Sequence, residues 1–238
     1  MCLSWGMASC AIPANVDSAI IYSTGEPLEG ECVEFRLLYQ GDQLTSDGSP
    51  TVKHAIRRQF HPQLRQLWKS NSQLTNLARM RGIYADRAEP LPADSPEEAY
   101  EASFFEWMGR LYERQNFHFV PLIEQSLCVK VSLDILFLRR DQHPLIKAGG
   151  DIDNRLKTLF DALRVPETTA GLGGIPLDGE DPFFVLLQDD CLISEVRVST
   201  DNLLMLPRQV NPNPKDAFLV IDVKLKTTER TSHNWAYE

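Results

Sequence analysis

The clearest chemical pattern in the sequence is two aspartates followed by a lysine: Asp151, Asp153 and Lys157. Lys157 comes four residues after Asp153, so the two side chains can share one side of a helix that starts here. Asp151 precedes that helix in extended backbone and can point to the same place. Two carboxylates this close repel each other, and a divalent cation with a preference for hard oxygen ligands, Mg²⁺ or Mn²⁺, relieves the repulsion. The pattern therefore indicates metal-dependent chemistry on a phosphodiester.

A second acidic pair follows later in the chain. The residues Phe183 to Leu187 read as a short buried strand, and Asp189 and Asp190 come almost directly after it. Acids at this strand end would supply a third metal ligand. Each pattern also has an ordinary structural interpretation, because Asp153 or Asn154 is a good helix N-cap and the later pair fits a polar turn.

Taken together, these residues resemble the RusA family of Holliday junction resolvases. The family pattern is Asp-x-Asp-Asn-x-x-Lys at a helix start, then Asp-Ala-Leu, then Asp-Asp at the end of a following strand. The chain has these elements at 151–157, 161–163 and 189–190. The resemblance implies a Mg²⁺-dependent, structure-selective endodeoxyribonuclease of DNA recombination and repair, which acts as a homodimer and hydrolyses phosphodiester bonds in branched DNA.

The resemblance also implies roles for individual residues. It assigns metal binding to Asp151, Asp153 and Asp190, and catalysis to these three together with Lys157. Asn154 would fix the helix start or orient a metal-bound water, and Asp189 would support the ligands without binding the ion. The chain departs from the family in its longer, Gly- and Pro-rich connection at 164–182 and in its first hundred residues, which have no clear counterpart. These departures concern the substrate more than the metal site.

The charge of the chain is negative overall but unevenly distributed. A formal net charge of −9 counts against a non-specific nucleic-acid binder, which is usually basic. Residues 51–85, however, contain seven Lys or Arg and no acid. On predicted helices this block can present cations to DNA phosphates, although a solvated helix face is the ordinary alternative. The candidate DNA-binding residues are Lys53, Arg57, Arg58, Arg65 and Lys69.

The apolar periodicity predicts an α+β fold, a small mixed β-sheet with packed helices as in RusA. We expect strands at 31–39, 127–138, 183–187, 192–200 and 217–227. Helices are expected from residue 51, with Pro62 opening a second helix, at 98–113, and from the acidic pattern to residue 163. One domain would span 31–228 with a helical insertion at about 51–113, between a tail at 1–30 and a tail at 229–238. His118, flanked by two phenylalanines in a predicted strand, is interpreted as structural.

Composition predicts a cytoplasmic protein without a membrane span. The five cysteines form no C-x-x-C pair, no Lys or Arg precedes Arg36, and no apolar run approaches the length of a membrane helix. Two other functions remain open. One is a non-catalytic RusA-like module that binds branched DNA or a protein partner. The other, an Asp-x-Asp nucleotide-sugar transferase, is disfavoured because no Gly-rich phosphate loop precedes the acids.

Overall fold

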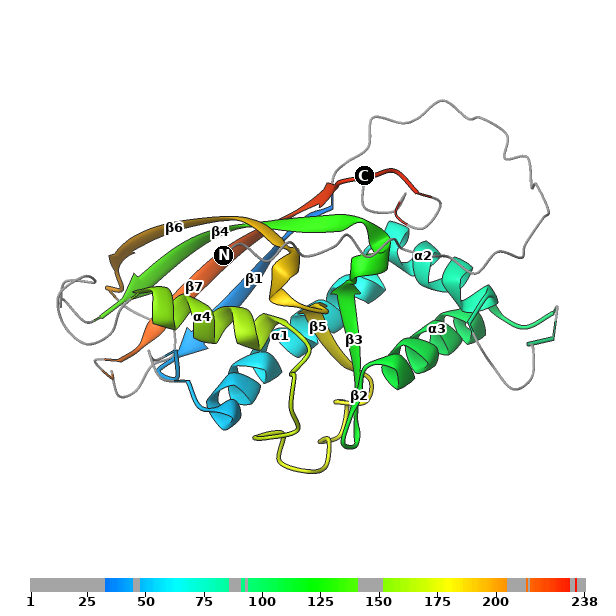
Figure 1. Cartoon of the computed structure of the whole chain (residues 1–238), viewed down its shortest axis with the longest axis horizontal. Coiled ribbons are helices and arrows are strands. Elements are labelled where there is room, and N and C mark those ends of the chain that lie inside the picture. Colours follow the sequence, from blue (N-terminus) through cyan, green and yellow to red (C-terminus); the bar gives the residue numbers. More distant parts are fainter. Residues whose placement is uncertain are drawn as a thin grey trace, which may run out of the picture. The chain divides into compact units, whose positions relative to one another are not determined.

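The computed structural model describes residues 33–44, 48–85, 91–92, 94–140, 152–204, 213, 215–231 and 234. Every described residue belongs to the unit formed by residues 31–238. This part is mixed α+β, with four α-helices and two mixed sheets among the described residues (Figure 1). None of its helices is both long enough and apolar enough to cross a membrane.

The larger sheet has four strands in the order β1-β7-β4-β6. Strand β7 (Ala217–Thr227) runs antiparallel to both β1 (Glu34–Gly41) and β4 (Val129–Arg139), whereas β6 (Ile193–Asn202) is parallel to β4. The predicted alternation of β4 is confirmed, because its odd-numbered residues from 129 to 137 are all buried. These side chains give the sheet one apolar face.

The smaller sheet has the order β2-β3-β5. Strand β2 (Glu113–Arg114) is antiparallel to β3 (Phe117–Ile123), and β3 is parallel to β5 (Phe183–Leu187). All five residues of β5 are buried, which confirms the predicted short buried strand. The short 3₁₀ turns η1 (Gln125–Leu127) and η2 (Asp190–Leu192) precede β4 and β6.

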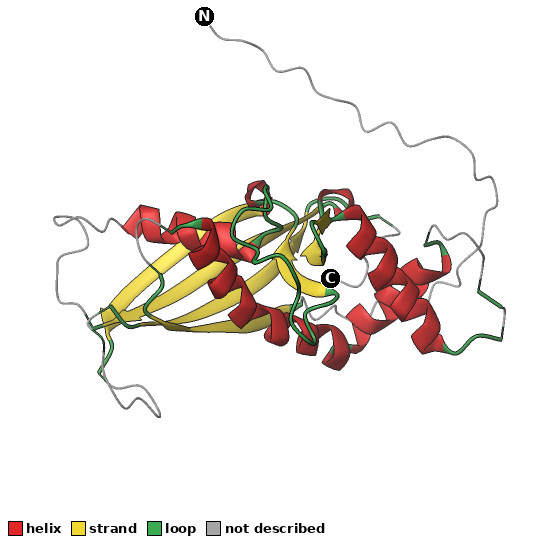
Figure 2. Cartoon of the chain, turned by 90° about the horizontal axis from the view of Figure 1, so that it is seen from below, coloured by secondary structure: helices red, strands yellow, loops and turns green. Residues whose placement is uncertain are grey.

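The helices are α1 (Pro50–Ser70), α2 (Ser72–Ile83), α3 (Glu97–Leu111) and α4 (Ile152–Leu163). Helix α1 packs against β1, β5 and α4, so it joins the two sheets. Figure 2 shows helices lying over one face of the larger sheet. Side chains from α1 and α4 share a single hydrophobic core with the inner residues of β4 and β7.

The prediction that Pro62 opens a second helix is wrong. Helix α1 continues through Pro62, and the break falls at Asn71, whose side chain caps α2. Proline removes one helical hydrogen bond, and here the Gln63 side chain adds one by donating from Nε2 to the carbonyl oxygen of Gln59 at 2.8 Å. The same amide joins α1 to β1, because it donates to the Leu38 carbonyl at 2.7 Å and accepts from the Leu38 N–H at 2.9 Å.

Helix α4 has the predicted apolar face, formed by Leu156, Leu159, Phe160 and Leu163, which packs into the main core. Its start differs from the prediction. The helix begins at Ile152, so Asp153 and Asn154 lie in its first turn and neither is the N-cap. An acid in the first turn is still favourable, because the exposed N–H groups there carry partial positive charge.

The C-terminal segment, predicted as a polar tail, contains one residue packed on the domain. Asn234 is buried, and its side-chain amide donates to the carbonyl oxygens of Leu127 at 2.8 Å and Glu229 at 2.6 Å. Two hydrogen bonds to the main chain fix this amide beside η1, so position 234 is part of the folded unit.

Candidate active site

The N-terminal half of α4 carries two exposed charged side chains, Asp153 and Lys157, one helical turn apart. The Asp153 carboxylate accepts a hydrogen bond from the N–H of Asn154 at 2.8 Å. Neither Asp153 nor Lys157 makes an ion pair with another described residue. Asp161, the next acid along the same helix, is paired with Lys53 at 2.7 Å. The helix therefore leaves its first acid and its lysine available to a ligand and holds the later acid in the fold.

The structure places the second acidic pair at the other end of α4. Asp189 accepts from the N–H of Cys191 at 2.9 Å, and this bond lowers the pKa of Asp189. The Asp190 carboxylate lies 3.9 Å from the Nε of Arg164, the residue that directly follows α4. At 1.5 Å per residue, Arg164 is about 16 Å along the helix axis from Asp153. The contact of Asp190 with Arg164 therefore lies toward the opposite end of α4 from Asp153.

Of the two acids predicted to bind the metal near the start of α4, the structure describes Asp153. Asp151 lies outside the described residues, and within the described ones no group of three His, Cys, Asp or Glu side chains could hold an ion. Mg²⁺ needs few protein carboxylates, because it keeps several waters and fills other positions with substrate phosphate. The exposed carboxylate of Asp153 matches this hard-oxygen preference.

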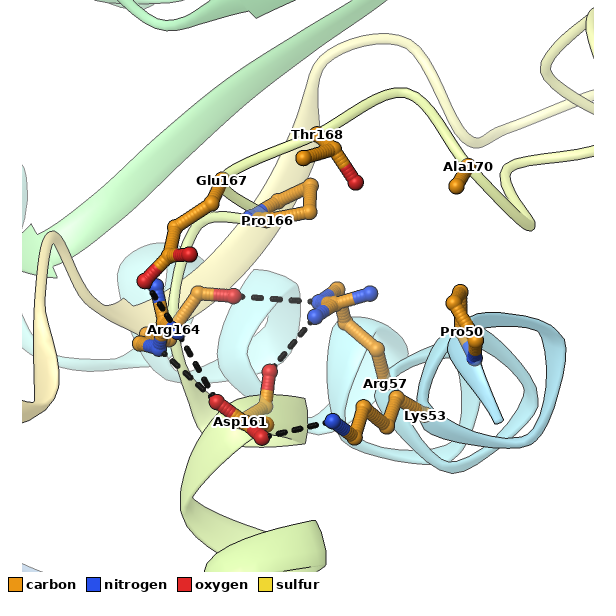
Figure 3. A pocket seen from close by; sticks show the side chains of 9 residues that line it. All are labelled: Pro50, Lys53, Arg57, Asp161, Arg164, Pro166, Glu167, Thr168 and Ala170. Atoms are coloured by element: carbon orange, nitrogen blue, oxygen red, sulfur yellow. Dashed lines mark hydrogen bonds and ion pairs between the residues drawn. The ribbon is translucent and has the colours of Figure 1, made fainter. Parts of the chain in front are cut away.

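The C-terminal end of α4 carries a network of ion pairs that ties the helix to α1 (Figure 3). Asp161 accepts from Arg164 at 2.8 Å as well as from Lys53, and Arg164 also contacts Glu167 at 2.7 Å. Burial alone would raise the pKa of Asp161, yet the hydrogen bonds from Lys53 and Arg164 outweigh it and lower that pKa. Asp161 is thus a charged structural link between the two helices.

The expectation of an exposed basic helix face is wrong for Arg57. Its side chain is 3% exposed and donates to two main-chain oxygens, those of Arg164 at 3.1 Å and Asp161 at 2.6 Å. Arg57 therefore closes the end of α4 against α1 and does not lie on the outer surface.

The other four predicted DNA-binding residues differ in how many contacts their side chains make within the protein. Lys53 is paired with Asp161, and Arg58 with Glu180 at 2.7 Å. Arg65 is exposed and donates to the carbonyl oxygen of Gly179 at 3.3 Å. Lys69 is exposed and makes no ion pair within the described part of the chain. The helix thus presents Arg65 and Lys69 to the outside, whereas the remaining cations contact neighbouring segments.

Sequence reasoning missed a partner for His118. Its Nδ1 lies 2.9 Å from the carboxylate of Asp181, and both residues line a cavity of about 500 Å³ with Phe105 of α3. A Cβ on Gly109 would lie 2.7 Å from the Cβ of His118, so the glycine lets α3 approach β3 closely. The pair is 63 positions apart in the sequence, and no spacing rule links such distant residues.

Comparisons with models of protein families, with curated proteins and with solved structures found no match for this chain. The resemblance to RusA resolvases therefore depends on the residues at 150–198 quoted above, while the α+β class follows from the structure.

Proposed function

We propose that this protein is a Mg²⁺-dependent endodeoxyribonuclease that cleaves branched DNA in the manner of RusA resolvases. The observation that carries the proposal is the exposed pair Asp153 and Lys157 on α4, without ionic partners among the described residues and within the composite acidic pattern. An exposed carboxylate and an ammonium one turn apart can contact a hydrated Mg²⁺ and a phosphate, respectively. A cytoplasmic location would suit the scattered cysteines.

In this proposal Asp151 and Asp153 would hold the ion, which when bound neutralises phosphate charge and activates water. Lys157, one turn along the helix, stabilises negative charge that develops on the phosphate or the leaving oxygen. Asn154 is exposed in the first turn of α4 and can orient a water there. Asp189 is engaged with the main chain of η2, so its role is to shape the turn before β6.

Asp190 enters the proposal differently. Its contact with Arg164 lies toward the opposite end of α4 from Asp153, so we consider binding of the ion from a second copy of the chain. The homodimer implied by the family resemblance provides such a copy. We therefore propose that Asp190 acts, if at the metal, in the site of the partner subunit.

The test is a cleavage assay with a labelled four-way DNA junction and a linear duplex, each with and without Mg²⁺. Wild type is compared with Asp153→Asn and with a matched control, Asp178→Asn, which changes another exposed aspartate. We expect symmetric cutting of the junction alone, lost without metal and in Asp153→Asn but kept in the control. Tight binding without cutting in Mg²⁺ or Mn²⁺ would instead favour the non-catalytic binding module.

A further inference from the structure

A small cavity lies between the start of α1 and the segment that follows α4 (Figure 3). Its volume is about 110 Å³. The charged residues in its wall are three bases and two acids: Lys53, Arg57, Arg164, Asp161 and Glu167. Pockets for drug-sized ligands are about 300 to 1,000 Å³, so this cavity suits a single small group rather than a whole nucleotide.

The base at the centre of this wall is Arg57, whose charge meets no carboxylate directly. Its guanidinium donates to the carbonyl oxygens of Arg164 and Asp161, and its Nη1 lies 3.5 Å from the Nδ1 of His54. All of these acceptors are neutral. Burial and the nearby Arg164 lower the pKa of Arg57 to about 10, and the negative charge of Asp161 opposes them only in part. Burying a charge that is only partly balanced is costly, so an anion would be favourable here.

The charges in the cavity wall also favour an anion. The Asp161 carboxylate is shared by Lys53 and Arg164, and Glu167 contacts Arg164. Two acids therefore face three bases. Asp190 approaches Arg164 at 3.9 Å, but it is not part of the cavity wall and its side chain is half exposed, so solvent screens it.

The geometry leaves donors facing the empty space. In Figure 3 the Nη1 of Arg57 points away from the two main-chain bonds of the guanidinium, toward the space between Thr168, Ala170 and Pro50. This nitrogen also lies 3.5 Å from the Nδ1 of His54, so one of its two N–H groups is left for the cavity. The hydroxyl of Thr168 faces the same space. We propose that this cavity is a phosphate-binding subsite in which Arg57, Lys53 and Thr168 hold one phosphate group. Its assignment to a phosphate of the DNA backbone rests on the proposed function, since free phosphate has the same chemistry.

The decisive variant fills the cavity and leaves the ion pairs in place. Ala170 is exposed and lines the cavity, so Ala170→Leu adds bulk there without removing a polar contact. Thr169→Leu is the matched control, because Thr169 is the exposed neighbour and is not in the wall. Lys53→Gln is a second variant, which removes one of the three positive charges of the wall together with its ion pair to Asp161. Arg57 itself is unsuitable, because its loss would break the contacts between α1 and α4.

Inorganic phosphate is titrated into each full-length protein at constant ionic strength, and the melting temperature is recorded. We expect a saturable rise in wild type and in Thr169→Leu, with an apparent Kd at least tenfold weaker in Ala170→Leu and in Lys53→Gln. No saturable rise in wild type, or equal rises in all four proteins, would overturn the subsite.

A second arm measures binding of the four-way junction without metal. If the phosphate belongs to DNA, Ala170→Leu weakens junction binding, and inorganic phosphate competes with the junction only in proteins whose cavity is open. Phosphate binding with unchanged junction binding would overturn the assignment to DNA. Neither binding measurement depends on cleavage. Failure of the proposed nuclease function would therefore show in the cleavage assay with Asp153→Asn and not in these measurements.

Discussion

His54 makes the stability of this fold depend on pH in a way that can be calculated. The imidazole is 2% exposed on α1 and lies against the rings of Phe117 and Phe183, with centroids 5.2 and 5.5 Å away. Its Nε2 has no hydrogen-bond partner among the residues that the structure describes. Burial lowers the pKa of His54 from 6.5 to about 4, and the nearby positive charges of Arg57 and Arg58 add to this effect, against a smaller opposing effect of Glu180.

Because the pKa of His54 is lower in the folded state, the folded protein binds this proton less readily than the unfolded chain. The titration of His54 therefore contributes nothing to the free energy of unfolding well above pH 6.5. As the pH falls toward 4, it lowers that free energy. A difference of 2.5 units corresponds to roughly 3 kcal/mol in total, of which about 2 kcal/mol is lost between pH 7.5 and pH 5. His61 also has a lowered pKa through burial and acts in the same direction.

The assay is urea unfolding followed by tryptophan fluorescence at several values between pH 7.5 and pH 5. In His54→Gln the free energy of unfolding should fall by about 2 kcal/mol less than in wild type over this range. A second variant that cannot titrate, His54→Leu, should flatten the curve equally, whatever its absolute stability. Curves for wild type and both variants that run parallel would refute the reasoning, because His54 would then not be held neutral in the fold.

Three further predictions concern the proposed site and the core. In Lys157→Met, junction cleavage should fall by about a hundredfold while junction binding is largely kept, as measured by single-turnover kinetics and anisotropy; equal losses in both would contradict a role in charge stabilisation. If Asp190 serves the partner subunit, mixing inactive Asp153→Asn and Asp190→Asn proteins should restore about a quarter of wild-type cleavage. About half of the randomly formed dimers are mixed, and each mixed dimer keeps one intact site of two. No recovery, or an active Asp190→Asn protein, would exclude this arrangement. Glu124→Gln should lower the free energy of unfolding, measured by urea titration, by about 3 kcal/mol, because it weakens a buried ion pair with Arg81 at 2.5 Å. A loss below about 1 kcal/mol would show that the ion pair contributes little to stability.

The elements that could be predicted from the sequence are those whose burial follows a local period. Strand β4 alternates strictly, β5 is a short continuous apolar run, and the apolar face of α4 recurs at helical spacing. The break between α1 and α2 could not be predicted, because its position depends on tertiary contacts. Gln63 anchors the helix to β1 beside Pro62, and the cap that ends the segment is at Asn71.

The candidate site also has features that could be predicted from the sequence and features that could not. The spacing of Asp153 and Lys157 is local, so their shared exposure at the start of α4 could be expected. The place of Asp190 depends on the path of residues 164–182. A Cβ on Gly171, which has a φ of +78°, would lie 2.4 Å from the main chain of Pro50, so this segment is seated tightly on α1. No pattern in the sequence specifies such a contact, and none distinguishes a buried Arg57 from a solvated one.

The side-chain amide of Gln63 affects whether another strand can pair with the edge of the larger sheet. Strands β1 and β6 are the outermost strands of that sheet. An outer strand normally offers unpaired N–H and C=O groups to any passing chain, which invites aggregation. On β1 three of these groups are already taken, since Gln63 pairs with both main-chain groups of Leu38, and Gln59 accepts from the N–H of Gln40 at 3.2 Å. Two glutamine side chains therefore take the place of a neighbouring strand at Leu38 and Gln40, which makes strand addition at this part of β1 less favourable.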